Sequence, residues 1–148
     1  MMAGREVRVT RTFDAPRRLV FQAWLDPAQI AAWMAPAGLN VPPSSVEVDP
    51  RPGGVIAYTM RDASSGREYP VRFEIVKMVE PELLVFESPP LPEFGFPERI
   101  TTRVVLEEDG GRTTVAVTQG PHTDESLADA DSGWNSMVEK LGELIAEG

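Results

Sequence analysis

The sequence predicts an α+β fold in which an antiparallel sheet packs against a long C-terminal helix. Three observations support this prediction: apolar residues recur at helical spacing early in the chain, the period changes to two residues from Val46 onward, and the last segment returns to helical spacing. Short turn segments separate the alternating stretches, which favours antiparallel hairpins. Residues 1–148 are expected to form one domain, because a chain of this length buries roughly 70% of its unfolded surface in one core.

The first elements are a strand and two short helices. Residues 6–13 alternate between apolar and polar side chains, which is typical of a half-buried strand. A helix is predicted over residues 16–25, where Pro16 suits the first turn and apolar residues follow at spacings of three and four. Asp26 is a suitable N-cap and Pro27 a suitable first residue for a second helix. We therefore expect two short helices joined by a kink.

Six strands are predicted in the middle of the chain, each bounded by turns rich in Gly, Pro, Ser or Asp. They cover residues 46–48, 55–61, 68–79, 83–88, 98–107 and 112–119. The run over residues 88–97 contains several prolines and is too long for a tight turn, so it is predicted to be a surface loop.

The final segment predicts the longest helix, over residues 124–147. Thr123 is a suitable N-cap, and Asp124 and Glu125 favour the positive end of a helix. Apolar residues then recur at three and four as far as Ile145. At 1.5 Å per residue this helix is about 36 Å long, so it must lie across the whole sheet.

Composition argues against several classes of function. The formal net charge is −9, which repels the phosphates of nucleic acids and of anionic membranes. The chain has no cysteine, so disulfides and thiolate metal sites are excluded. Its most apolar run is far shorter than the about 20 residues of a spanning helix, and no signal peptide is visible at the N-terminus. These features predict a cytoplasmic protein without membrane insertion or a nucleic-acid partner.

Several motifs occur in an order that is found in a known family. They are residues 11–27 (RTFDAPRRLVFQAWLDP), 33–36 (WMAP), 49–54 (DPRPGG), 69–71 (YPV), 81–86 (PELLVF) and 133–134 (GW). These motifs resemble the AHSA-type family (activator of heat-shock protein 90 ATPase homologue-like), a branch of the START or birch-pollen-allergen-like superfamily, SRPBCC. The resemblance extends from Val7 to Ile145.

The resemblance implies a helix-grip fold, in which a strongly curved antiparallel sheet wraps around the C-terminal helix and the two short helices close one end. Members of the superfamily bind lipids, polyketides, flavonoid-like compounds or plant hormones, some are cyclases or hydrolases, and a related domain of the namesake contacts a chaperone. Two positions depart from the family pattern. Met34 stands where a second tryptophan is usual, and Ile56 replaces a common aromatic residue, so both changes would reshape a pocket mouth.

A curved sheet around one helix commonly leaves an apolar cavity, and strand alternation predicts which side chains face it. We expect the cavity to bind a small hydrophobic or aromatic molecule. The predicted lining is Trp33, Ile56, Tyr58, Met60, Val71, Phe73, Leu84, Phe86, Thr102, Val104, Val115, Val117, Gln119, Trp134, Met137 and Leu141. Tyr58, Thr102 and Gln119 are the polar members that would orient a ligand. The alternative is that the same side chains fill a solid core.

Catalytic residues, cofactors and metal ligands are not predicted. His122, the one histidine of the chain, is expected in an exposed loop before the last helix, where a histidine is usually solvated. Glu74 and Arg103 are expected to face outward from the middle of their strands. A bulge or a one-residue slip would turn them toward the cavity.

Two other functions remain open at the level of sequence. One is an enzyme of the cyclase or hydrolase kind, with Tyr58 or Gln119 as polar anchors. The other is a protein-interaction module that uses Phe94 and Phe96 in the proline-rich loop. A homodimer is compatible with every reading, and contact with a chaperone is implied by the resemblance alone.

Overall fold

The computed structural model describes residues 5–36, 38–90 and 99–147 of the chain. The elements follow in the order β1 (Arg5–Phe13), α1 (Arg17–Gln22), α2 (Pro27–Trp33), β2 (Leu39–Asn40), a 3-10 turn (Pro43–Ser45), β3 (Glu47–Val48), β4 (Val55–Asp62), β5 (Glu68–Val79), β6 (Leu83–Ser88), β7 (Ile100–Asp109), β8 (Arg112–His122) and α3 (Asp124–Glu147).

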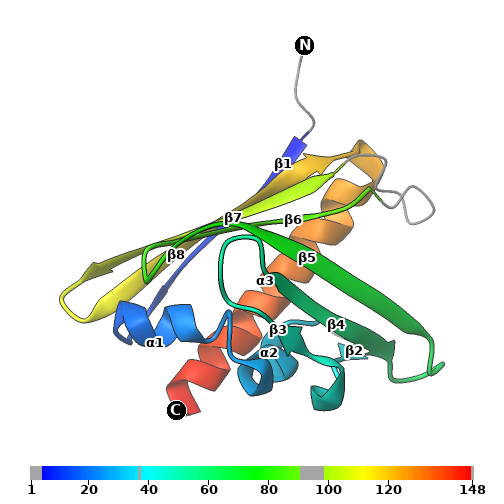
Figure 1. The fold of residues 1–148 in the computed structure, drawn as a ribbon, viewed down its shortest axis with the longest axis horizontal. Coiled ribbons are helices and arrows are strands. Elements are labelled where there is room, and N and C mark those ends of the chain that lie inside the picture. Colours follow the sequence, from blue (N-terminus) through cyan, green and yellow to red (C-terminus); the bar gives the residue numbers. More distant parts are fainter. Residues whose placement is uncertain (1–4, 37, 91–98, 148) are drawn as a thin grey trace.

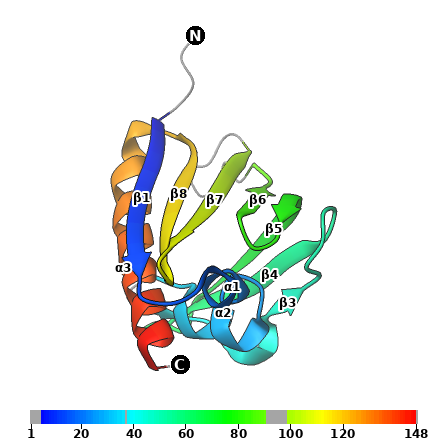
Figure 2. The same cartoon turned by 90° about the vertical axis from the view of Figure 1, so that its left-hand side faces the viewer.

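The strands form one antiparallel sheet in the order β1-β8-β7-β6-β5-β4-β2, with β3 also paired to β4. The sheet curls, α3 runs along its concave side next to β1, and α1 and α2 lie at one end (Figures 1 and 2). This arrangement confirms the predicted helix-grip α+β fold. Because α3 runs along the sheet, one face of the helix is turned toward the sheet. Apolar residues therefore recur along that face.

Most predicted elements are present, and the differences arise from pairing between distant segments. The short strand β2 was not predicted; it exists because Leu39 and Asn40 pair with the end of β4. Strand β8 continues beyond the predicted end at Gln119 as far as His122, which pairs with Arg5 of β1. Helix α1 ends at Gln22, three residues before the predicted end. None of the helices in the described part of the chain is long and apolar enough to cross a membrane.

The two short helices are held by the interactions that the sequence predicts for their ends. The Asp26 carboxylate accepts a hydrogen bond from the backbone N–H of Gln29 at 3.0 Å, as expected for an N-cap. At the other end of α2, the Trp33 indole N–H donates to the carbonyl oxygen of Ala23 at 2.8 Å. Trp33 is fully buried. It therefore joins α2 to the end of α1 as a structural residue of the core.

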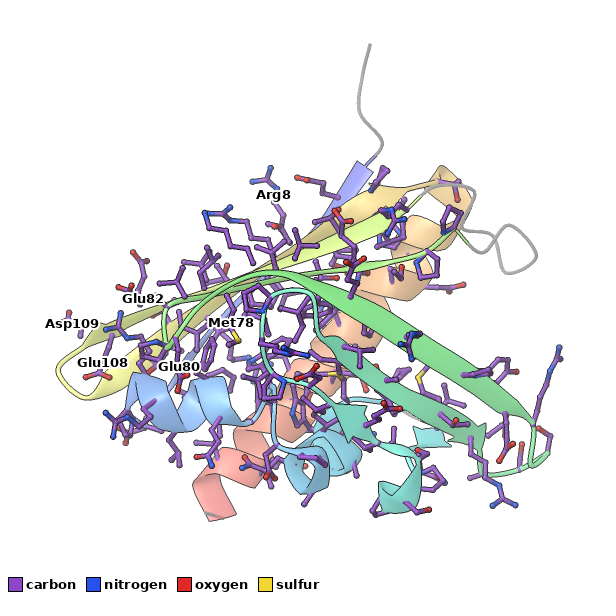
Figure 3. All side chains as sticks on the ribbon, viewed as in Figure 1. Arg8, Met78, Glu80, Glu82, Glu108 and Asp109 are labelled. Carbon is purple, nitrogen blue, oxygen red and sulfur yellow. The ribbon has the colours of Figure 1, made fainter. Side chains whose placement is uncertain are left out.

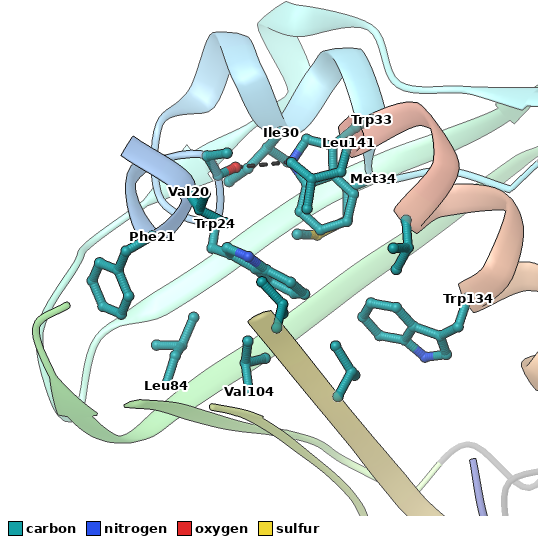
Figure 4. Packing of buried hydrophobic residues seen from close by; sticks show 14 of the residues in the cluster. Val20, Phe21, Trp24, Ile30, Trp33, Met34, Leu84, Val104, Trp134 and Leu141 are labelled. Carbon is teal, nitrogen blue, oxygen red and sulfur yellow. Dashed lines mark hydrogen bonds between the residues drawn. The ribbon is translucent and has the colours of Figure 1, made fainter. Parts of the chain in front are cut away.

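The centre of the core is a cluster of tryptophans (Figure 4). The Trp24 ring lies 4.6 Å from the Trp33 ring at an edge-on angle of 76°, and 5.9 Å from the Trp134 ring in a stacked arrangement. Phe86 of β6 contacts the other side of Trp24, with ring centres 6.5 Å apart. One tryptophan from the segment after α1 thus fills the space between α2, α3 and the sheet.

Several charged side chains lie away from the tryptophan cluster, at turns and on the outer side of the sheet. Glu80, Glu82, Glu108 and Asp109 lie at the turns near α1, and Arg8 projects from the outer side of the sheet (Figure 3). The Arg17 guanidinium is 3.5 Å from the Glu82 carboxylate, which offsets part of this acidic charge. Such exposed pairs contribute little to stability.

Candidate ligand cavity

A cavity of about 440 Å³ lies between the concave face of the sheet and α3. Its size falls within the range of small-molecule sites. Most of its wall is apolar, with three methionines and four tyrosine, phenylalanine or tryptophan rings among the contributing side chains. The lining residues are Met34, Pro36, Tyr58, Met60, Pro70, Val71, Arg72, Phe73, Phe86, Ser88, Pro89, Ile100, Gln119, His122, Asp129, Ala130, Gly133, Trp134 and Met137.

On one side of the cavity, strands β5 and β6 separate. Strand β5 pairs with β4 along residues 68–74, but it pairs with β6 only from Glu74 onward. Within the described residues, the first half of β5 therefore pairs with β4 alone. The two hairpins diverge on this side in Figure 1, and Pro70, Arg72, Ser88 and Pro89 of the cavity wall come from the two sides of the gap.

Prolines explain why this gap does not close. The backbone N–H of Ile75 points toward the β4 side of β5 and donates to the carbonyl oxygen of Gly54 at 2.9 Å. Backbone groups point to alternate sides along a strand. The backbone polar groups of Arg72 and Pro70 therefore point to the opposite side, toward β6. Pro70 has no N–H to donate there, and Pro89 brings the same loss to the residue after β6. Extension of the β5–β6 pairing would thus lack donors on both strands.

Half of the predicted lining residues lie on the cavity wall. They are Tyr58, Met60, Val71, Phe73, Phe86, Gln119, Trp134 and Met137. The other half face inward but do not reach the cavity, and at most 1% of each is exposed: Trp33, Ile56, Leu84, Thr102, Val104, Val115, Val117 and Leu141. Around Trp33, Leu84, Val104 and Leu141, Trp24 occupies the space under α3 (Figure 4). Thr102 instead lies behind Gln119, whose amide nitrogen donates to it. Both alternatives, cavity and solid core, therefore hold at different ends of the same helix.

His122 corrects the sequence-based expectation. It is 5% exposed and lies on β8 at the cavity wall, not in a solvated loop. Its Nε2 is 3.0 Å from the Gln119 side-chain oxygen, and the Gln119 amide nitrogen donates to the Thr102 hydroxyl at 2.8 Å. Burial lowers the pKa of His122 below its ordinary value of 6.5, so the ring is neutral at pH 7. The position of His122 on the cavity wall follows from the pairing of β8 with β1. This pairing joins segments far apart in the chain, so no local pattern in the sequence indicates it.

Tyr58 is the polar residue on the opposite wall, on β4. The residue is 6% exposed, and its ring centre is 6.3 Å from that of Phe73. Loss of hydration raises the pKa of its hydroxyl well above the ordinary value. The hydroxyl forms no hydrogen bond with another residue of the described ranges. It is therefore a neutral group that a molecule in the cavity can contact.

Charged groups reach the cavity only at its rim, within the described residues. Arg72 and Asp129 contribute to the wall and are exposed. Glu74 and Arg103 are exposed on the outer face, as predicted. A bulge does occur in β5, between Ile75 and Lys77, but it follows Glu74 and leaves its orientation unchanged.

Two other features of the site concern metals and the loop phenylalanines. Among the described residues, no group of three or more His, Asp and Glu side chains is placed to hold a metal ion. Phe94 and Phe96 lie outside the described residues.

Comparisons with known proteins support the resemblance seen in the motifs. Comparison with curated protein sequences gives no match. Among solved structures, a protein from Chromobacterium violaceum has a TM-score of 0.82 at 22% identity, covering 94% of this chain and 95% of that one. A protein from Nitrosomonas europaea has a TM-score of 0.81 at 19% identity, covering 99% and 97%.

The AHSA1 protein from Silicibacter pomeroyi has a TM-score of 0.77 at 22% identity, covering 97% of this chain and 100% of that one. At these identities the likeness shows the shared fold. The family described as "Activator of Hsp90 ATPase homolog 1-like protein" matches residues 14–146, nearly the whole chain. The chain therefore belongs to the family of activator of Hsp90 ATPase homolog 1-like proteins.

Proposed function

We propose that this protein binds a small hydrophobic or aromatic molecule in the cavity between the curved sheet and α3. The observation that carries the proposal is a mostly apolar cavity of about 440 Å³ between the sheet and α3. The fold family, whose members commonly bind hydrophobic ligands, is consistent with it.

The wall is suited to such a ligand in two ways. Moving apolar ligand surface out of water contributes roughly 25 cal/mol per Å², and most of the wall offers apolar partners for that surface. Met34, Met60 and Met137 also line the cavity. Their unbranched side chains adapt to ligands of different shape, which favours binding of a range of related molecules.

The test uses two substitutions of alanine by phenylalanine on the same helix. Ala130 lines the cavity, whereas Ala128, two residues earlier on α3, is exposed. Binding is measured by titration with the neutral fluorescent probe N-phenylnaphthylamine, whose emission rises in apolar surroundings. We expect wild-type protein and Ala128→Phe to bind the probe equally. Ala130→Phe places a ring at the cavity wall and should weaken binding by about tenfold or more, since a filled cavity offers no site.

Both variants must first show the wild-type circular dichroism spectrum and a cooperative unfolding transition. Equal affinity in the folded Ala130→Phe variant would mean that the probe binds elsewhere. Absence of saturable binding to the wild-type protein, tested also with long-chain alcohols as competitors and in thermal-shift experiments, would count against the function itself.

A further inference from the structure

The polar side chains on the cavity wall differ in whether they already form hydrogen bonds within the protein. Gln119 uses both ends of its amide, because its nitrogen donates to Thr102 and its oxygen lies against His122. Tyr58 is different, because its hydroxyl has no hydrogen-bond partner among the described residues although the residue is more than nine-tenths buried. The sealed polar side-chain atoms without a partner in the described residues are Arg17 Nε and Trp24 Nε1. The Tyr58 hydroxyl is not one of them, because it borders the cavity, where a bound molecule can form a hydrogen bond with it.

Trp134 of α3 adds a second donor that borders the cavity. It lines the cavity and is 5% exposed. Its indole N–H also forms no hydrogen bond with a described residue. An indole nitrogen can only donate, and Tyr58 stays protonated because burial raises its pKa. Both the Tyr58 hydroxyl and the Trp134 indole can therefore donate a hydrogen bond, which an acceptor atom of a ligand would receive.

The inner part of the cavity is also uncharged. The ionisable residues of the cavity wall other than Tyr58 are Arg72 and Asp129, which are exposed, and the neutral His122. An ionised carboxylate bound beside Tyr58 and His122 would lose its hydration without a buried cation as its partner, which is strongly unfavourable. A carbonyl or ether oxygen carries no such cost and accepts one hydrogen bond.

We propose that the ligand is an uncharged aromatic molecule with a carbonyl or ether oxygen, and that this oxygen accepts a hydrogen bond from the Tyr58 hydroxyl. This inference rests on the proposed function, since it identifies the chemical class of the molecule in the same cavity. Tyr58 then acts as a specificity-determining residue, and the apolar wall provides most of the affinity.

The experiment compares two isosteric probes and two tyrosine variants. Naphthyl methyl ketone and isopropenylnaphthalene, substituted at the same ring carbon, differ in C=O against C=CH₂. Tyr58→Phe removes the cavity hydroxyl. Tyr69→Phe removes the hydroxyl of the other tyrosine of the chain, which is not part of the cavity wall. Dissociation constants are measured by displacement of N-phenylnaphthylamine.

The preference of each protein for the ketone over the hydrocarbon is the quantity to compare, because the difference in hydration of the two probes then cancels. We expect Tyr58→Phe to reduce this preference by about threefold to tenfold, the range for one neutral hydrogen bond. Tyr69→Phe should leave it at the wild-type value. The corresponding acid, naphthoate at pH 7.5, should bind the wild-type protein at least tenfold more weakly than the ketone.

The outcomes separate this inference from the proposed function. Binding of both probes with the same preference in wild type and Tyr58→Phe overturns the role of Tyr58 and leaves the cavity as a hydrophobic site. Naphthoate binding as tightly as the ketone overturns the restriction to uncharged ligands. Failure of every probe to bind any of the folded proteins contradicts the proposed function, and the inference with it.

Discussion

Two buried hydroxyl groups on the sheet contrast in their hydrogen bonding. Thr113 is fully buried and its hydroxyl donates to the carbonyl oxygen of Ala15 at 2.7 Å, so it links β8 to the segment before α1. Tyr58 is almost as buried but has no such partner among the described residues. The Thr113 hydroxyl is satisfied within the fold, whereas the Tyr58 hydroxyl borders the cavity and makes no hydrogen bond that the fold depends on.

This contrast predicts opposite effects of removing each hydroxyl. Thr113→Val should lower the free energy of unfolding by about 1–3 kcal/mol, because the buried carbonyl of Ala15 loses its donor. Tyr58→Phe should leave it within about 0.5 kcal/mol of wild type or raise it, because no protein hydrogen bond is lost. Urea denaturation followed by tryptophan fluorescence measures both. A loss in Tyr58→Phe as large as that in Thr113→Val would mean that the Tyr58 hydroxyl is structural.

His122 gives a prediction for the dependence of stability on pH. Its pKa is lower in the folded protein than in the unfolded chain because burial disfavours the charged ring. As the pH falls through the unfolded value near 6.5, the unfolded state therefore binds more protons, and the free energy of unfolding decreases. The chain has no other histidine, so His122→Gln should flatten the profile between about pH 7.5 and 5.5. An unchanged slope in that variant, or a folded-state pKa above 6.5 by NMR, would contradict this prediction.

At the scale of elements, glycines in α3 and in the turn before β4 respond differently to a side chain. A Cβ at Gly133 would lie 3.7 Å from the Pro36 Cβ, which is ordinary van der Waals contact. A Cβ at Gly54 would overlap the carbonyl oxygen of Asp49. The chain thus has room for a methyl group at the helix position and none in the turn.

Gly133→Ala is accordingly expected to raise the free energy of unfolding by about 0.5–1 kcal/mol, the usual gain for alanine over glycine within a helix. Gly54→Ala should lower it by more than this gain, since the turn must shift to relieve the overlap. Thermal and urea unfolding of the two variants provide the measurement. If both changes acted in the same direction, the glycine environments described above would be wrong.

The separation of β5 from β6 is also a property of elements. In the described residues it combines the half of β5 that pairs with β4 alone with the prolines Pro70 and Pro89. The β5–β6 register stops at the Glu74–Glu87 pair, and residues of both strands beyond this pair line the cavity. The gap beside the cavity is therefore a property of the backbone of the sheet.

At the scale of the whole molecule, α3 divides the concave side of the sheet into a filled end and an open end. Trp24 and Trp33 fill the end where α1 and α2 lie. Trp134 of α3 stands at the boundary, since it stacks on Trp24 and also lines the cavity. The filled end and the cavity are thus different parts of one continuous core.

The sequence by itself determined the family, the order of the main elements and the face on which each strand residue lies. The predicted bounds of β5, β6 and α3 match the structure, because side-chain period, turn residues and helix caps are local signals. Inward and outward positions follow from the same period, as Tyr58 and Glu74 show.

Only the tertiary structure decided which inward residues meet the cavity. Val104 and Phe73 have the same alternation in sequence, yet Val104 is sealed in the core and Phe73 lines the cavity. The difference is set by Trp24, which comes from a distant segment. The burial of His122 likewise depends on pairing with β1, more than a hundred residues away in the chain. The burial of an inward-facing residue and the pairing register of its strand arise from contacts between segments that are far apart in sequence. A local pattern of residues carries no information about these contacts.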